Sequence, residues 1–441
     1  MFRATRWVSN LLLLIVVLVL LPAGPLQKAQ AEERSVSLKE FNQLKTEHEK
    51  LKKEFQALKT LIRKERSVPF STARKAPSPG KDYVTAKEFK AFKKKSEETL
   101  PGLTNVLITG YAFAGYTDAQ KSDSNFSTGF NPLFLWKLND RLLFESELEF
   151  ELEDGSTNTK LEYAHLTYLL NDFVTLGVGK FLNPFGIFRE RLHPKWINKL
   201  PDFPLGYKSG ATRLVPGAQV GAQVRGGVPL GEGSKANYAF WLSNGPTLQT
   251  GASNAGQLAF TNTNDNNNNK AFGFRVGVLP IPELELGYSL EASRVGSSGS
   301  AFSNIDALLQ GVDVSYIRDS KLLKGVVNLR SEWLLSDVDK ADYGTSGGRF
   351  KNERSAWYLQ AAYRPSRVSL PFVKNLEPVL RFDKLDQPAL APSNVDERRW
   401  TMGLNYWLTP SMVLKAAYQM SDKKEGSADG DTALLQAAMG F

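Results

Sequence analysis

Apolar and polar side chains alternate along most of the chain from residue 104 to residue 441. The clearest case is residues 141–153, RLLFESELEFELE, where five glutamates share one set of alternate positions while leucine and phenylalanine dominate the other. A period of two predicts a β-strand with one apolar and one hydrated face. Such an apolar face meets a second sheet in a soluble sandwich and lipid in an outer-membrane barrel, so the other segments must decide between the two.

Sixteen alternating segments follow one another along this part of the chain. They span 104–117, 129–138, 141–153, 160–170, 173–180, 217–228, 235–243, 271–279, 284–294, 306–316, 325–335, 354–364, 377–385, 398–408, 412–420 and 432–441. Short turns, such as residues 139–140, alternate with long polar loops at 181–216, 244–270, 336–353 and 421–431. This asymmetry and the even strand number predict an all-β transmembrane antiparallel barrel over residues 102–441, with both of its ends on the short-turn, periplasmic side.

The apolar faces favour lipid rather than a protein core as their surroundings. Trp400 and Met402, for example, alternate with the inward positions that include Arg399. A Lys or Arg side chain at the lipid midplane costs about 2–4 kcal/mol, and the charged residues keep to the opposite face. Helical spans are excluded, because no segment after the first 31 residues approaches roughly 18 continuous apolar residues. The last segment ends with Phe441 on its apolar face, which resembles the terminal aromatic signal that directs the assembly of outer-membrane barrels.

The N-terminal residues have a different character. Residues 1–31 combine two arginines, an apolar run of eleven residues and the small-residue pattern Ala29-Gln30-Ala31, which together predict a signal peptide cut after Ala31. The apolar run is shorter than the roughly 20 residues that a membrane anchor needs. We therefore expect an exported protein of the bacterial outer membrane with a periplasmic N-terminal segment.

Residues 32–66 predict a coiled coil. Phe41, His48, Phe55 and Ile62 recur every seven residues, and leucines at 44, 51 and 58 occupy the companion positions. A short helix of this kind is marginal alone, so we expect it to join copies of the chain; the alternative is a single helix lying on its own domain. Residues 67–101 predict a proline-containing linker and a short basic helix, which either contacts an anionic surface or is solvated.

The net charge of +9 does not indicate nucleic-acid binding. Residues 1–31 carry three basic and no acidic side chains, residues 32–101 carry 18 and 11, and residues 102–441 carry 34 and 35. The predicted barrel is balanced, so a basic groove for nucleic acid is not expected. The chain has no cysteine and three histidines, which leaves no thiol chemistry and few metal ligands, and we expect no cofactor.

The connection at residues 181–216 is the candidate for a pore constriction. Its prolines and aromatic residues predict a loop of fixed shape, and in general porins the loop at this place folds into the lumen. A folded-in loop with six cations would favour anions. The alternative is a loop that packs over the rim or against a neighbouring subunit. The six cations are Arg189, Arg191, Lys195, Lys199, Lys208 and Arg213.

Inward positions of the predicted strands give the lumen two unlike walls. The basic wall consists of Arg225, Arg275, Arg330, Arg364, Arg381, Arg399 and Lys415. The acidic wall consists of Glu145, Glu147, Glu149 and Glu151. Facing walls of opposite charge predict a transverse field that orients dipolar solutes. Alternate glutamates of one strand lie roughly 6.6 Å apart, too far for two of them to grip one small cation, so no metal site is expected.

Two motifs around the long connection resemble the phosphate-selective porin O/P family. Residues 179–186, GKFLNPFG, and residues 216–221, PGAQVG, are similar to its GxF-x-x-PFG and PGxQxG patterns. The resemblance extends loosely over residues 104–441, including LRFD at 380–383 and GLNY at 403–406. It implies a sixteen-stranded porin that forms a homotrimer through its barrel and its coiled coil. The row of glutamates argues against a uniformly cationic path for phosphate.

The leading hypothesis is therefore a passive outer-membrane channel for small hydrophilic, anionic solutes. A second hypothesis is a structural barrel that tethers the outer membrane to the cell wall through its N-terminal helices. A barrel enzyme is disfavoured, because His165 is the main inward histidine and no Ser/His/acid set accompanies it. The strand number and the terminal aromatic disfavour a soluble lectin-like sandwich.

Overall fold

The computed structural model describes residues 105–441, except residues 154–155, 209, 252, 261–262, 264, 344–347, 393–395 and 425–429. The predicted signal peptide (1–31), coiled coil (32–66) and linker with basic helix (67–101) lie outside the described residues. No helix among the described residues is long and apolar enough to cross a bilayer.

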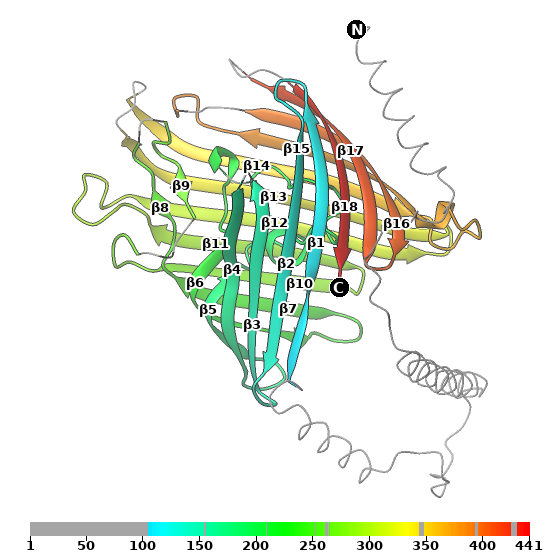
Figure 1. Ribbon diagram of the computed structural model, residues 1–441. Coiled ribbons are helices and arrows are strands. Elements are labelled where there is room, and N and C mark those ends of the chain that lie inside the picture. The colour runs from blue at the N-terminus through cyan, green and yellow to red at the C-terminus, as the bar shows by residue number, and fades with distance from the viewer. Residues whose placement is uncertain are drawn as a thin grey trace, which may run out of the picture. The chain divides into compact units, whose positions relative to one another are not determined.

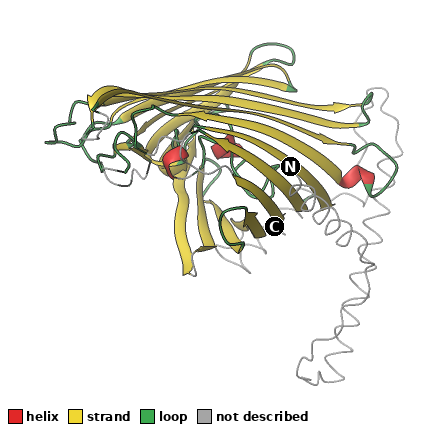
Figure 2. Cartoon of the chain, turned by 90° about the horizontal axis from the view of Figure 1, so that it is seen from above, coloured by secondary structure: helices red, strands yellow, loops and turns green. Residues whose placement is uncertain are grey.

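Over the described residues, sixteen antiparallel strands form a closed barrel. They are β1 (Val106–Ala119), β2 (Asn125–Lys137), β3 (Leu142–Glu153), β4 (Ser156–Leu169), β5 (Thr175–Leu182), β6 (Ala218–Pro229), β7 (Lys235–Ser243), β10 (Ala271–Ile281), β11 (Leu284–Arg294), β12 (Asp306–Ser320), β13 (Gly325–Asp342), β14 (Arg349–Arg364), β15 (Leu376–Asp386), β16 (Glu397–Thr409), β17 (Met412–Lys423) and β18 (Gly430–Gly440). Each strand pairs with its neighbours in sequence, while β8 (Thr247–Leu248) and β9 (Leu258–Ala259) form a separate small sheet between β7 and β10. Figures 1 and 2 show the strands inclined to one another around the barrel.

The observed strands confirm all sixteen predicted segments, but two of the predicted long loops are wrong in extent. β13 continues to Asp342 and β14 begins at Arg349, so the loop expected at 336–353 shortens to residues 343–348. The one expected at 421–431 shortens in the same way, to residues 424–429. The sequence did not predict these strand ends, because their outward positions are polar. Trp333 pairs with Trp357 on the outer face, whereas four residues further along Asp337 pairs with Glu353.

Exposure alternates along the strands as the sequence predicts. Phe240 and Leu242 of β7 are exposed on the outer face, whereas Trp241 between them is buried inside. On β16, Trp400 and Met402 are exposed while Arg399 and Thr401 are buried, so the charge of Arg399 lies inside the barrel. An apolar outer surface of this kind suits lipid, because a cation there would cost about 2–4 kcal/mol at the bilayer midplane.

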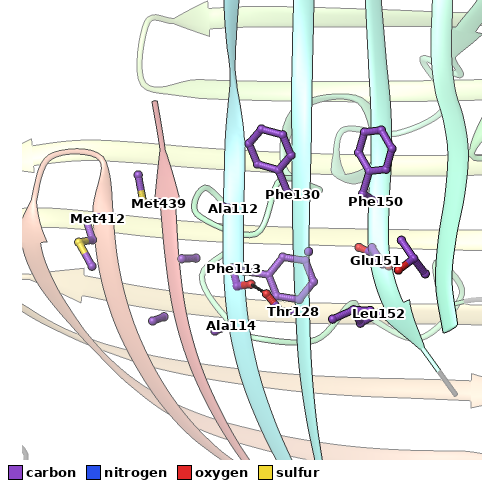
Figure 3. Close-up of a pocket in the computed structure, with 14 residues that line it drawn as sticks. Ala112, Phe113, Ala114, Thr128, Phe130, Phe150, Glu151, Leu152, Met412 and Met439 are labelled. Atoms are coloured by element: carbon purple, nitrogen blue, oxygen red, sulfur yellow. Dashed lines mark hydrogen bonds between the residues drawn. The ribbon is translucent and has the colours of Figure 1, made fainter. Parts of the chain in front are cut away.

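The outer face also carries an apolar recess of about 520 Å³ across β18, β1, β2 and β3. The small side chains of Ala112, Ala114 and Ala437 line it, and larger ones, including Phe130 and Phe150, project beside them (Figure 3). The recess arises because alanines stand next to phenylalanines on neighbouring strands.

The barrel closes where its first and last strands meet. The Cα partners run from Tyr111 with Gly440 to Ala119 with Thr432. Phe441 prolongs the pairing: its backbone N–H donates to the Gly110 carbonyl at 3.0 Å, and its carbonyl accepts from the Gly110 N–H at 3.2 Å. The Phe441 ring stacks on Phe130 with centroids 5.7 Å apart. The terminal residue therefore clamps the first two strands to the last.

We expect the variant Phe441→Ala to assemble several-fold less efficiently than the wild type, because it loses the stack on Phe130 and the terminal aromatic. The fraction of folded barrel can be measured by its heat-modifiable mobility on gels. Phe126→Ala is the control, since Phe126 is an exposed aromatic residue at the beginning of β2, four residues before Phe130. Equal yields for Phe441→Ala, Phe126→Ala and wild type would show that the terminal ring has no part in assembly.

Candidate functional site

The connection between β5 and β6, residues 183–217, packs an apolar cluster against the barrel. It contains the short helix α4 (Phe188–Arg191) and the 3-10 turn η1 (Gly210–Thr212). Its buried side chains in the cluster are Phe185, Ile187, Phe188, Leu192, Leu205, Tyr207, Leu214 and Val215. They pack with strand residues that include Trp241, Leu309, Leu334, Tyr358 and Leu385. The hydrophobic effect thus fixes this long connection to the strands.

Glu332 of β13 holds the beginning of the connection. One carboxylate oxygen, Oε2, accepts hydrogen bonds from the Ile187 N–H at 2.9 Å and the Tyr207 hydroxyl at 2.6 Å, and Oε1 accepts from the Tyr358 hydroxyl at 2.6 Å. Gly186 allows this approach: its φ is +67°, and a Cβ there would lie 2.1 Å from Oε2 of Glu332. The carboxylate is therefore saturated by neutral donors, which meets the requirement that buried polar groups be hydrogen-bonded.

Asp202 holds the middle of the connection against β15 and β16. Its two carboxylate oxygens meet the Nη2 atoms of Arg381 at 2.7 Å and Arg399 at 3.1 Å. Arg381 also donates from Nε to Asp383 at 2.9 Å, and Asp383 accepts the Leu205 N–H at 3.0 Å. Burial alone would raise the pKa of Asp202, but the two guanidinium groups outweigh it and hold the pKa below its usual value.

Lysines complete the attachment to β15 and β17. The Lys199 ammonium lies 2.6 Å from a carboxylate oxygen of Glu377. Lys415 points the other way, from the wall toward the connection, and donates to the carbonyls of Lys195 and Asn198, the latter at 2.6 Å. These bonds tie the same part of the connection to β15 a second time and to one more strand, β17.

Helix α4 presents three successive charged residues to three other strands. Its pairs are Arg189 with Glu162 of β4, Glu190 with Arg225 of β6 at 2.5 Å, and Arg191 with Glu285 of β11 at 2.8 Å. A helical turn spreads consecutive side chains by about 100°, which is why three neighbours reach three different strands.

The remaining predicted cations of the connection have no carboxylate partner among the described residues. Lys195 lies 4.9 Å from the ring centroid of Phe203 and 5.1 Å from that of Phe113, and its burial lowers its pKa. Arg213 donates to the Val215 carbonyl at 3.1 Å, and burial with the nearby Arg189 charge lowers its pKa to about 10. Lys208 is exposed.

The predicted basic wall is mostly paired with carboxylates or carbonyls. Arg275 meets Asp313 at 2.6 Å and Glu285 at 3.1 Å, and the partners of Arg225, Arg381, Arg399 and Lys415 are those given above. Arg364 donates to the Lys374 carbonyl at 3.2 Å and lies over the Trp407 ring. The buried Nε atom of Arg330 has no hydrogen-bond partner within the described part of the chain.

The predicted acidic wall is likewise engaged. Glu145 lies 3.1 Å from Nε2 of His165, and Glu149 lies 2.9 Å from the Lys160 ammonium. Glu147 accepts the Tyr111 hydroxyl at 2.8 Å. Glu151 of β3 also has an interaction partner. Most of the acidic and basic side chains therefore have a close hydrogen-bond or ion-pair partner, whereas Arg330 and Arg364 have no carboxylate partner among the described residues.

The sequence prediction missed the carboxylates that pair with the cations of the connection and of the basic wall. They are Glu162, Glu285, Asp313, Glu377 and Asp383. Alternation could have found most of them: Asp383 is two residues from Arg381 on the same face, and Glu285, Asp313 and Glu377 also occupy inward positions. Glu162 could not be found in this way, because a register shift in the β3–β4 pairing breaks the alternation beside it.

Two polar hollows lie between α4 and the wall made by β3–β10. One, of about 310 Å³, is lined by residues that include Glu190, Arg191, Arg225 and Arg275. The other, of about 150 Å³, shares Glu190 and Arg225 and adds Glu145. Charged and amide side chains line this space together with apolar ones, so it can hold water and small hydrophilic solutes.

Comparison with solved structures identifies the fold as that of sixteen-stranded outer-membrane porins. OmpF of Salmonella typhi, solved in complex with daunomycin, aligns with a TM-score of 0.50 and 13% identity over 76% of this chain and 97% of OmpF. The anion-selective porin from Comamonas acidovorans aligns with a TM-score of 0.50 and 12% identity over 76% of this chain and 99% of that porin. No protein-family profile and no curated protein sequence matches this chain. The resemblance to the phosphate-selective porin O/P family stays a prediction.

We expect Asp202→Asn to weaken the attachment of the connection by about 3–5 kcal/mol, because Arg399 and Arg381 lose a buried counter-charge. Proteolysis of native protein within residues 183–217 measures the attachment. Because the folded-state pKa of Asp202 lies below its usual value near 3.8, its stabilisation is present above about pH 4 and is lost as pH falls through the lowered pKa.

The control is Asp319→Asn, which removes an exposed carboxylate paired with Arg367. We expect this control to cleave like wild type near neutral pH. A wild-type rate for Asp202→Asn at neutral pH, or an equal acid response in wild type and Asp202→Asn, would contradict the role given to Asp202.

Proposed function

We propose that the protein is a porin of the bacterial outer membrane, through which small hydrophilic solutes diffuse passively. The closed sixteen-stranded barrel, its apolar outer face and its charged interior support this proposal. A lipid-facing exterior around a polar interior is the arrangement of a transmembrane barrel that encloses water. The hollows beside α4 supply polar space along the inner wall.

We further propose that residues 181–216 narrow the lumen. Support comes from the partners of this connection, which are inward side chains of strands far apart around the barrel. Glu162 lies on β4, Glu285 on β11 and Glu332 on β13, while Lys415 lies on β17. A single connection that reaches all four strands has to cross the interior, and its many anchors would keep the passage at a fixed width.

We also propose that the channel prefers anions. This preference is supported by the exposed fractions of the side chains in two ion pairs. In the pair of Arg191 and Glu285 the arginine side chain is 37% exposed and the carboxylate 14%. In the pair of Arg225 and Glu190 the values are 39% and 14%. A solute would therefore meet guanidinium edges, while the carboxylates lie behind them.

Other side chains modify this preference. Lys160 repeats the pattern, with 52% exposure against 15% for Glu149. Arg330 and Arg364 add half-buried guanidinium groups that have no carboxylate partner among the described residues. Glu145 acts in the opposite direction, because it is 31% exposed and its partner His165 only 12%. The expected selectivity is therefore a moderate preference for anions and no exclusive filter.

The homotrimer, the periplasmic coiled coil and the cell-wall tether remain proposals that rest on the sequence. The coiled coil and the tether concern residues 32–101, which lie outside the described residues. Chemical cross-linking of the full-length protein in membranes tests the trimer, and co-sedimentation with purified cell wall tests the tether.

We expect the double variant Arg191→Gln with Arg225→Gln to lose the preference for anions, because the exposed guanidinium edges disappear while Glu190 and Glu285 stay. The reversal potential in a planar bilayer under a salt gradient measures this change. The wild type should give the sign of an anion-selective pore and the variant a value near zero or of opposite sign.

Arg367→Gln is the matched control, since Arg367 is an exposed arginine in an ion pair with Asp319 at the short-turn end. Its reversal potential should equal that of the wild type. A cation-selective wild type would contradict the proposed preference, and a double variant with unchanged anion selectivity would remove Arg191 and Arg225 from its cause.

A further inference from the structure

The second long connection, residues 244–270, packs against the inner wall of the barrel. Ala255 of this connection is buried in an apolar cluster with Val338 of β13 and Phe350 of β14. Phe350 faces inward, because it shares the alternate positions of β14 with Tyr358, which lies in the apolar cluster of the first connection. The second connection therefore covers the long-loop ends of β13 and β14 from the inside and shields them from water.

Arg354 of β14 is buried in this covered part of the wall, with 4% of its surface exposed. Two of its three guanidinium nitrogens donate to amide oxygens: Nε to Asn352 at 3.0 Å, and Nη1 to Gln387 at 3.4 Å. The third, Nη2, is buried and has no hydrogen-bond partner within the described part of the chain. Asn352 also donates from Nδ2 to the Gly256 carbonyl at 2.6 Å, which joins Arg354 to the second connection.

Two buried amide groups near Arg354 add further donors. Gln387 turns its Oε1 toward Arg354, since a guanidinium group can only donate, and this leaves its Nε2 as a donor. That Nε2 has no partner among the described residues, and the same is true of Nε2 of Gln257, the residue after Gly256. Gln387 and Gln257 are only 8% and 7% exposed. Buried N–H groups therefore outnumber the acceptors that the neighbouring side chains offer them.

No carboxylate of the described residues forms an ion pair with Arg354. Asp396 is close to it in the hydrogen-bond network, but its Oδ1 accepts the backbone N–H of Gln387 at 2.8 Å. Glu397 accepts the Ser421 hydroxyl at 2.5 Å, and it belongs to β16, two strands or roughly 10 Å from β14. A buried charge is costly unless a counter-charge accompanies it. The described side chains therefore leave the charge of Arg354 unbalanced.

We propose that Arg354 and Gln387 bind a small monovalent anion, a halide such as chloride, with Nη2 and Nε2 as its donors. An anion accepts both donors and supplies the missing negative charge, whereas a water molecule would satisfy the donors only. One guanidinium group carries one charge and the donors are buried, so a halide fits better than phosphate or sulfate. The bound anion would join β14 and β15 beneath the second connection and stabilise the folded barrel. The proposal requires only the folded barrel and does not rest on the proposed channel.

The dependence of unfolding on chloride tests the site in the purified full-length protein. The midpoint of thermal unfolding, followed by heat-modifiable mobility on gels, is compared in sodium chloride and in sodium gluconate of equal ionic strength. A ligand that binds only the folded state stabilises it, so chloride should raise the midpoint of the wild type by at least about 2 °C.

The variant Arg354→Gln should lose this chloride-dependent rise, because it lacks the charge and the Nη2 donor. Arg354→Lys keeps a charge and should retain part of the rise, which separates anion binding from general damage to the fold. Arg349→Gln is the matched control, since Arg349 is an exposed arginine of the same strand that donates to the Lys340 carbonyl at 3.2 Å. The control should respond to chloride like the wild type.

Anomalous diffraction from wild-type crystals grown in bromide instead of chloride locates the anion without relying on the folding of any variant. A bromide peak within hydrogen-bond distance of Nη2 of Arg354 is the expected result, and a water molecule in its place would overturn the proposal. Equal midpoints of the wild type in the two salts, an undiminished rise in Arg354→Gln, a lost rise in Arg349→Gln or a rise with phosphate alone would also overturn it. A bromide peak without a chloride-dependent rise in solution would indicate an adventitious ion only, with the same consequence.

Discussion

Backbone hydrogen bonding in a bilayer is the constraint on which this structure depends. A lipid environment offers no partner for a free N–H or carbonyl, so a sheet can cross it only when its first and last strands pair. Here β1 and β18 pair from Tyr111 with Gly440 to Ala119 with Thr432, and Phe441 adds one further bonded residue. Closure separates two surfaces with opposite requirements: an apolar exterior, and an interior that can hold charge.

The interior charges obey a second constraint, the cost of burying an unpaired ion. Removing one partner of a buried pair costs roughly 3–5 kcal/mol, so a close counter-charge stabilises a buried arginine near the 183–217 connection. Asp202 serves Arg381 and Arg399 at once, and the three pairs of α4 extend the same principle to β4, β6 and β11. The function we propose depends on which member of each pair faces the open space, and around α4 that member is the guanidinium group.

The strands could be predicted from sequence because lipid outside and polar groups inside impose a period of two on each of them. The prediction of strand ends failed at the long-loop side, where the outer face meets water and Asp337 and Glu353 replace Trp333 and Trp357. The partners of the charged residues could not be predicted, because they depend on the path of a long connection. Asp202 and Arg381, for example, are 179 residues apart in the chain. The alternation therefore indicated which inward positions are charged, but not which of these charges are exposed and which are paired.

The central claim is a channel whose width is set by the 183–217 connection. Single-channel conductance in a planar bilayer, with neutral polymers of graded size added on each side, tests it most directly. A variant in which a short Gly-Ser linker replaces residues 184–215 provides the comparison, once its barrel is shown to fold. The account predicts open conductance in the wild type and a polymer cut-off clearly smaller than that of the variant. No conductance in the wild type, or the same cut-off in both proteins, would contradict it.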